Sequence, residues 1–306
     1  MSAAVLITGI AGFLGRHVAR HFARAGWEVI GIDEMPPENV QIPAVYHRLA
    51  LPSAEFPKLL RSAQPAVCVH CAGRAAVGAS MANPAADYRS NTALTFELLD
   101  QLRQHAPACR FILLSSAAVY GDPTSLPITE NHASAPLSPY GYHKKAAELL
   151  CEEFARIYGL PTLSVRIFSA YGPGLRRQVV WDICEKIITT GRLPLHGTGL
   201  ESRDFIHAAD IARALHLLAT AAPAVGEAYN LASGREVTIA ELATLLLSTL
   251  RSSLHAEFDG KSTPGNPLRW QADITRIRAL GFEPSIALEQ GVKTVAAWSA
   301  AELSIS

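Results

Sequence analysis

The chain has 306 residues, of which 49% are hydrophobic and 18% are charged, and its formal net charge at pH 7 is zero. A chain of this length can bury one large core or two joined ones. The neutral balance argues against nucleic acid as a partner, and the interrupted apolar stretches are too short to span a membrane. With no secretion signal and five cysteines that form no disulfide framework, we expect a cytoplasmic protein.

Short apolar runs alternate with helical patterns over the first 170 residues. In chain order, the sequence predicts a strand at 3–8, a helix at 13–26, strands at 27–33 and 66–72, a helix at 91–106, a strand at 110–116, a helix at 140–159 and a strand at 162–168. Strands that lack alternation and are separated by helices are typical of a parallel sheet covered on both faces. The expected fold class is therefore α/β, with a doubly wound parallel sheet of the Rossmann type.

The pattern becomes irregular after residue 174, with a helix near 179–190 and several turn-rich stretches. A strand at 227–232 and a helix at 238–250 are expected to return to the main sheet. The C-x-x-C pair at 68–71 lies in an apolar, strand-like run without a second ligand pair, so we expect core cysteines there.

A glycine-rich turn links the first predicted strand to the first helix, with Gly9, Gly12 and Gly15 in the spacing G-x-x-G-x-x-G. Glycines in such a turn let backbone N–H groups approach a pyrophosphate at the helix N-terminus. Asp33 ends the second strand, where a carboxylate binds ribose hydroxyls and repels a 2′-phosphate. Since the segment 34–39 offers no Arg or Lys, the sequence favours NAD over NADP.

The stretch "SPYGYHKKAAELL" at 138–150 offers two Tyr–Lys pairs at helical spacing, Tyr140 with Lys144 and Tyr142 with Lys145. A free tyrosine has a pKa near 10, about three units too high for a base at pH 7. A neighbouring ammonium group and a positive nicotinamide ring would favour the phenolate. Serines at 115–116 end another strand, so a hydroxyl, a phenol and an ammonium suit hydride transfer at a carbinol.

From "TGIAGFLG" at 8–15 to "ADITRIRALGFEP" at 272–284, the sequence resembles the extended short-chain dehydrogenase/reductases, in particular the nucleotide-sugar epimerase/dehydratase group. The Y-x-x-x-K motif of that family matches Tyr140 and Lys144, which selects this pair. The resemblance implies that Tyr140 is the general base and that Lys144 lowers its pKa and holds the nicotinamide ribose. Ser116 matches the catalytic Ser or Thr that bridges the sugar hydroxyl and Tyr140.

The resemblance also implies which residues contact each ligand, and no metal is expected. The implied cofactor contacts are Gly9, Gly12, Phe13, Leu14, Gly15, Asp33, Ala72, Gly73, Arg74, Asn91, Ser115, Tyr140, Lys144 and Phe168. The implied substrate contacts are Ala75, Ser116, Ser169, Arg203 and Arg269.

Three positions depart from the family pattern on the substrate side. Ser169 stands where the family has Asn, and "STPGNP" at 262–267 replaces the usual R-P-G-D, so Lys261 or Arg269 is expected to substitute. Arg203 matches the arginine that binds the nucleotide diphosphate. Near Ala50 the acid that normally meets the adenine is missing. The histidines are expected to be packing or rim residues: His70, His143, His196 and His207.

The segment after Ser116 distinguishes between reactions of the family. Dehydratases and decarboxylases carry acids there, whereas this chain has Ala117 and Ala118. The resemblance therefore favours NAD-dependent epimerisation of a nucleotide-diphosphate sugar at C4 through a 4-keto intermediate, with a UDP-hexose as the expected substrate. The alternatives are a nucleotide-sugar 4-ketoreductase, a 4,6-dehydratase and a nucleotide-binding module without catalysis.

The resemblance also suggests how the chain is divided and assembled. The helices at 91–106 and 140–159 are those that family members use for a four-helix dimer interface, so a homodimer is expected. The expected domains are a Rossmann domain for NAD at 1–170, with 203–250 returning to it, and a smaller mixed lobe for the substrate made of 171–202 and 251–306.

Overall fold

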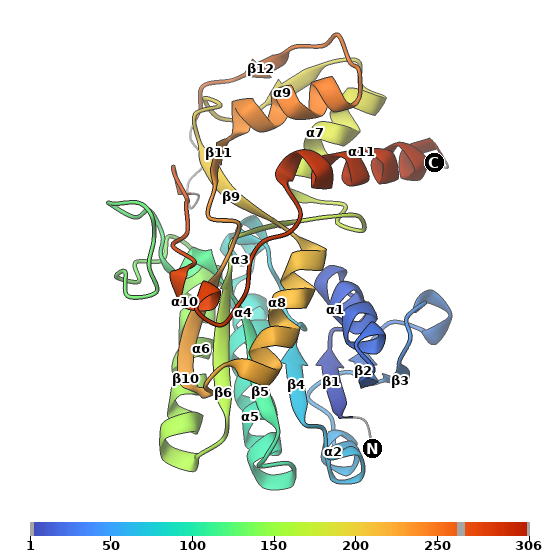
Figure 1. The fold of residues 1–306 in the computed structure, drawn as a ribbon, viewed down its shortest axis with the longest axis vertical. Coiled ribbons are helices and arrows are strands. Elements are labelled where there is room, and N and C mark those ends of the chain that lie inside the picture. Colours follow the sequence, from blue (N-terminus) through green and yellow to red (C-terminus); the bar gives the residue numbers. More distant parts are fainter. Residues whose placement is uncertain (1–2, 262–266, 305–306) are drawn as a thin grey trace.

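A computed structural model describes residues 3–261 and 267–304 (Figure 1). Its main feature is a seven-stranded sheet in which every neighbouring pair is parallel. In spatial order the strands are β10 (Val225–Leu231), β6 (Thr162–Ile167), β5 (Arg110–Ser116), β4 (Val67–His70), β1 (Ala4–Thr8), β2 (Glu28–Asp33) and β3 (Val45–Arg48). The prediction of a doubly wound Rossmann sheet is confirmed.

Helices cover both faces of this sheet, which explains why its strands read as continuous apolar runs. One face carries α1 (Phe13–Arg24) and α8 (Ala208–Ala221), and the other carries α2 (Phe56–Ala63), α5 (Leu94–His105) and α6 (Pro139–Tyr158). Alternate residues of one strand serve opposite cores: Val5 and Ile7 pack toward α1, whereas Leu6 packs toward α2 and α5.

Helix α6 has well-defined ends that place its first turn at the edge of the sheet. Ser138 precedes it, and its Oγ accepts a hydrogen bond from the N–H of Gly141 at 3.2 Å. Pro139 occupies the first turn, and Gly159 follows the last residue with φ 68°, which favours glycine. The predicted helix at 140–159 is therefore correct within one residue.

A smaller lobe lies above the carboxyl ends of the large sheet (Figure 1). Its strands are β7 (Ser169–Tyr171), β9 (Ser202–His207) and β11 (Glu236–Thr238) in one mixed sheet, and β8 (Leu193–Leu195) and β12 (Ala256–Phe258) in a second. Its helices are α7 (Gln178–Thr189), α9 (Ile239–Thr249) and α11 (Leu288–Ser304), which share a third core. The remaining short elements are η1 (Pro37–Asn39), α3 (Val77–Ala82), α4 (Pro84–Tyr88), η2 (Arg89–Ala93), η3 (Ala117–Val119) and α10 (Thr275–Arg278).

Two segments pack in a different part of the fold from the one predicted by the sequence. The helix predicted at 238–250 packs in the small lobe, where Leu242 and Leu246 contact α7 and α11, because it starts directly after β11 with a capping box at Thr238. Conversely, Ile277 and Phe282 fill the core of the large sheet. The assignment of one part to the cofactor and the other to the substrate stays a prediction.

The five cysteines are free thiols, of which Cys71 is half-buried and the other four are buried. Burial raises the pKa of Cys109 and Cys151 to about 12, which keeps both protonated. Among the described helices, none is long and apolar enough to cross a membrane.

Candidate active site

A cleft of about 880 Å³ opens between the large sheet and the small lobe. It lies at the carboxyl ends of β1, β4, β5 and β6, where parallel α/β sheets bind ligands. The predicted residues that line it are Gly9, Gly12, Phe13, Leu14, Gly15, Ala72, Gly73, Arg74, Ala75, Ser115, Ser116, Tyr140, Lys144, Phe168, Ser169 and Arg203. Asp33, Asn91 and Arg269 are not part of this lining.

The glycine turn is too tight for side chains. A Cβ on Gly15 would lie 2.3 Å from the carbonyl oxygen of Gly9, and a Cβ on Gly9 would lie 2.6 Å from the nitrogen of Ala72. Gly9 also has φ +67°, a conformation that favours glycine. The turn therefore leaves a bare backbone surface at the N-terminus of α1, which fits the diphosphate of a dinucleotide.

Asp33 organises the same turn from the end of β2. Its Oδ2 accepts a hydrogen bond from the N–H of Ala11 at 2.9 Å, and its Oδ1 accepts one from Glu34 at 2.8 Å. The pairing of β2 with β3 places Arg48 opposite Asp33, and Arg48 Nε donates to the carbonyl oxygen of Glu34. The segment 34–39 contains no Arg or Lys, but Arg48 on β3 brings a cation next to Asp33. Only the pairing of β2 with β3 shows this proximity.

Asn91 lies beneath the loop that follows β4. Its Nδ2 donates to the carbonyl oxygen of Arg74 at 3.1 Å, and a Cβ on Gly73 would lie 2.8 Å from its Oδ1. The side chain is 1% exposed and sits in the π-helical turn η2. Asn91 therefore packs beneath the loop that follows β4 and stabilises its shape without lining the cleft.

Ser116 and Tyr140 both line the cleft. Tyr140 is 7% exposed, and burial raises its pKa, whereas a side-chain hydrogen bond with Ser116 and the charge of Arg177 act in the opposite direction. Ser116 Oγ accepts a hydrogen bond from the N–H of Ala118 at 3.2 Å, which fixes the hydroxyl at the start of η3. The phenol and the hydroxyl are therefore placed as one proton-handling pair.

Lys144 lies one turn further along α6 and is also buried. Its Nζ donates a hydrogen bond to the carbonyl oxygen of Leu114 at 2.9 Å. Burial lowers the pKa of Lys144 to about 8, while nearby Asp87 favours the ammonium form. Tyr142, from the alternative pair, is 61% exposed. The structure thus brings Tyr140 and Lys144 into the cleft and leaves Tyr142 in solvent.

Two charged groups near Tyr140 were not anticipated from the sequence. Arg177 follows the "AYGPG" turn and lines the cleft. Its guanidinium donates a hydrogen bond to the carbonyl oxygen of Ala75, which connects the small lobe to the loop that follows β4. Asp87 in α4 is 2% exposed and pairs with His143 at 2.6 Å. Neither belongs to a motif, because both reach the site through packing between distant segments. His143, expected to be a packing or rim residue, lies on α6 and contacts Asp87 through its Nδ1.

The small lobe contributes cationic and aromatic side chains to the cleft. Arg203 lies over the ring of Trp270, 5.4 Å from its centroid, and burial lowers the pKa of its guanidinium. Lys261 and His196 line the same cleft. Residues 262–266 of the "STPGNP" segment lie outside the described residues.

Arg269 does not join the lining. Its guanidinium binds both carboxylate oxygens of Glu236, at 2.7 and 2.8 Å, and its side chain is 63% exposed. The position of Arg269 therefore does not support the predicted substrate contact, because its guanidinium already pairs with Glu236 on β11. Of the two suggested substitutes for the missing arginine, Lys261 is the one in the cleft.

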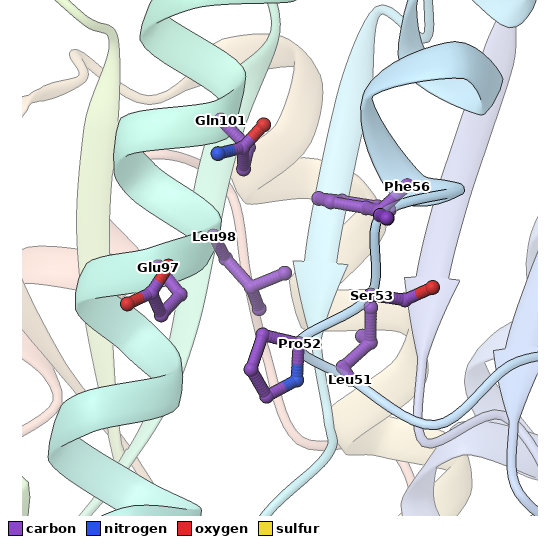
Figure 2. A pocket seen from close by; sticks show the side chains of 8 residues that line it. Leu51, Pro52, Ser53, Phe56, Glu97, Leu98 and Gln101 are labelled. Atoms are coloured by element: carbon purple, nitrogen blue, oxygen red, sulfur yellow. The ribbon is translucent and has the colours of Figure 1, made fainter.

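A second, smaller pocket of about 240 Å³ lies between α5 and the segment before α2. Figure 2 shows Glu97, Leu98 and Gln101 on one side and Leu51, Pro52, Ser53 and Phe56 on the other. Ser116, Tyr140 and Lys144 do not line it, so we assign the chemistry to the larger cleft.

The fold and the site define an enzyme that binds a dinucleotide and exchanges hydride and protons at a carbinol. The chain belongs to the NAD dependent epimerase/dehydratase family, whose sequence model matches residues 5–232. This confirms the resemblance found in the sequence and identifies NAD as the cofactor. That the glycine turn and Asp33 bind this cofactor stays a prediction from the sequence.

The relatives are named for more than one reaction. The chain is 29% identical to a UDP-glucuronate 4-epimerase of Thermodesulfobacterium geofontis, over 96% of this chain and 95% of that one. It is also 29% identical to the dTDP-glucose 4,6-dehydratase of Salmonella typhimurium, over 96% and 92%. The crystal structure of UDP-glucose 4-epimerase from Thermotoga maritima with UDP-glucose superposes with a TM-score of 0.90 at 27% identity, covering 98% of this chain and 99% of that one.

Proposed function

We propose that the protein is a 4-epimerase of nucleotide-diphosphate sugars, with a UDP-hexose as substrate. The observation that carries the proposal is the half-buried Ser116 paired with the buried Tyr140 beside Lys144, in a cleft whose other end holds Arg203. A proton-transfer centre at one end and a cation at the other suit a molecule with a reactive sugar and an anionic anchor.

Each side chain has a definable task in the reaction. Tyr140 takes the proton of the sugar 4-hydroxyl through its phenolic oxygen, and Ser116 orients that hydroxyl by a hydrogen bond. NAD, when bound, would supply the acceptor and donor of the hydride at C4. Lys144 presents a fixed ammonium group, since Leu114 holds its Nζ, and Tyr140 gives the proton back when the 4-keto group is reduced.

The same cleft disfavours the dehydratase alternative. Elimination of water needs an acid or base beside the sugar, and the residues after Ser116 are Ala117 and Ala118. The acids that line the cleft within the described residues are Asp182 and Glu201. Asp182 pairs with Lys186 at 2.8 Å, and Glu201 binds the turn at Thr198. Both are therefore already engaged by neighbouring groups of the protein.

Epimerisation also requires the sugar to present its opposite face without leaving. An anchored nucleotide makes this possible, because binding energy gained at a distance keeps the 4-keto sugar in the cleft while it turns. Arg203 and Lys261 at the far end supply positive charge for a diphosphate.

The test starts from the cofactor. The purified protein is denatured, any released nicotinamide nucleotide is identified by chromatography, and UDP-glucose, UDP-galactose and UDP-glucuronate are then screened for conversion. Near-stoichiometric NAD with 4-epimer formation supports the proposal. A protein that instead consumes added NADH or NADPH with a 4-keto nucleotide sugar would be a reductase, and loss of water would identify a dehydratase.

We also propose that the protein is a homodimer through α5 and α6. Three apolar side chains on these helices face outward: Phe96 is 42% exposed, Leu149 53% and Ile157 70%. Burying such a surface against a second copy would remove it from water. Light scattering should give twice the chain mass, and Leu149→Glu should yield a monomer. A wild-type protein that is monomeric at micromolar concentration would rule the proposal out.

A further inference from the structure

Three residues of α6 face the end of β5 at intervals of four, namely Tyr140, Lys144 and Glu148. Each engages one of the three consecutive residues 114–116. Tyr140 bonds to the side chain at 116, Lys144 to the carbonyl oxygen at 114, and Glu148 to the hydroxyl at 115. The third contact belongs to the same register as the two catalytic ones, yet its carboxylate has no part in the proposed reaction.

Glu148 is held more firmly than either of its catalytic neighbours. Its Oε1 accepts hydrogen bonds from Ser115 Oγ at 2.6 Å and from Arg166 Nε at 3.0 Å, and its Oε2 accepts one from Arg166 Nη2 at 2.8 Å. Glu148 and Arg166 are both 5% exposed. A two-point ion pair between buried groups has a narrow geometry, so it ties α6 to β6 as well as to β5.

The pair extends into a buried polar network across the sheet. Arg166 Nη1 donates to the phenolic oxygen of Tyr120 at 2.8 Å, and Tyr120 donates to Asn230 Oδ1 at 2.6 Å. Asn230 on β10 in turn donates to the carbonyl oxygen of Ile128. Hydrogen bonds therefore connect α6 to β5 and β6 directly and, through Arg166 and Tyr120, to β10.

Glu148 also contributes charge at Lys144. The groups that act on the ammonium are Asp87 from α4, Cys71 and His70 from β4 and its following loop, and Glu148 and Cys151 from α6 itself. Burial lowers the pKa of Lys144 to about 8, and Asp87 and Glu148 oppose that effect. Removing either carboxylate charge should therefore lower the pKa of Lys144 further.

We propose that Glu148 is a positioning residue for Tyr140 and Lys144. It fixes α6 against the ends of β5 and β6, and its negative charge favours the ammonium form of Lys144. This inference rests on the proposed function only for the roles of those two residues.

The first test measures the lysine directly and needs no substrate. The chain has six lysines, so 13Cε-lysine NMR can resolve each titration, with Lys144→Arg assigning the signal. In Glu148→Gln the midpoint of Lys144 should fall by about one pH unit. The matched control is Glu152→Gln on the same helix, whose carboxylate pairs with Arg156 and is 39% exposed; it should leave the midpoint unchanged.

The second test separates position from charge. Glu148→Asp keeps the negative charge but is one methylene shorter, so Ser115 and Arg166 cannot both be reached. We expect the Lys144 midpoint to stay at its wild-type value while kcat falls about tenfold and KM changes less than about twofold. In Glu148→Gln the alkaline limb of kcat should move to lower pH along with the lysine.

An unchanged Lys144 midpoint in folded Glu148→Gln, or an equal displacement in Glu152→Gln, would overturn the charge effect. A wild-type kcat in Glu148→Asp would overturn the positioning role. If Glu148→Gln does not fold, Glu148→Asp alone tests the proposal. If no nucleotide sugar is converted, the proposed function fails on its own, because the NMR titration still reports on Glu148.

Discussion

Asp33 and Arg48 are opposite residues on the parallel strands β2 and β3, at the edge where the adenosine ribose of NAD is expected. One carboxylate oxygen of Asp33 accepts a hydrogen bond from the N–H of Ala11, and the other accepts hydrogen bonds from the N–H groups of Glu34 and Met35. The guanidinium of Arg48 is exposed and lies next to the segment that follows Asp33. The site therefore combines an acid that rejects a 2′-phosphate with a cation that could receive one.

Replacing the acid should relax the choice of cofactor. In Asp33→Ser the repulsion is removed, a hydroxyl remains for the N–H of Ala11, and the preference for NAD over NADP should fall at least tenfold, about 1.4 kcal/mol. Dissociation constants of NADH and NADPH for nucleotide-free protein, followed by fluorescence, check this. The gain for NADPH should disappear in Asp33→Ser/Arg48→Ala; if it persists there, Arg48 is not its source.

The phenol of Tyr140 should be essential, and that of Tyr142 dispensable. Tyr140→Phe removes the group that accepts the sugar proton, so kcat should fall by about 10²- to 10⁴-fold while NAD content and folding are retained. Tyr142→Phe changes a 61% exposed side chain and should leave kcat unchanged. Rates for both variants under saturating substrate provide the comparison. Equal losses in the two would contradict the assignment of Tyr140.

The activity should decline on the alkaline side through the titration of Lys144. Because burial lowers its pKa to about 8, the ammonium form dominates below that value and is lost above it. A pH profile of kcat should therefore fall as pH rises through about 8, and Lys144→Met should be nearly inactive without that limb. Lys293→Met, at an exposed position on α11, should keep the wild-type profile. An alkaline limb that is unchanged in Lys144→Met would assign it to another group.

Arg203 and Arg269 should behave differently although both were expected to contact substrate. Arg203 lies over Trp270 at the far end of the cleft, so Arg203→Ala should raise KM by about tenfold or more with little change in kcat, which is the signature of lost anchoring. Arg269 is engaged by Glu236, so Arg269→Ala should change KM by less than about twofold. Initial rates over a range of nucleotide-sugar concentrations separate the two. A larger effect of Arg269→Ala would place the diphosphate elsewhere.

Residues close together in the chain account for most of what could be predicted. The glycine turn, Asp33 and the Tyr140–Lys144 spacing each depend on one strand-to-helix junction or one helix, so hydrophobic period and local geometry were sufficient. For the same reason six of the seven strands of the large sheet and α6 were predicted, whereas β3, which has no buried residue, was not. Helix α9 was assigned to the wrong layer, because an apolar period shows that a face is buried but not against which partner.

What the tertiary structure alone decided concerns pairs that are far apart in sequence. Arg48 comes beside Asp33 through strand register, Arg177 reaches Tyr140 through the packing of the small lobe, and Glu236 withdraws Arg269 from the cleft. Each of these three placements depends on a contact between separate elements. The sequence pattern of one element does not show which other element packs against it. The sequence by itself predicted the glycine turn and the Tyr140–Lys144 pair. The charges around that pair and the engagement of Arg269 by Glu236 came only from the folded chain, since electrostatic influence depends on distance in space.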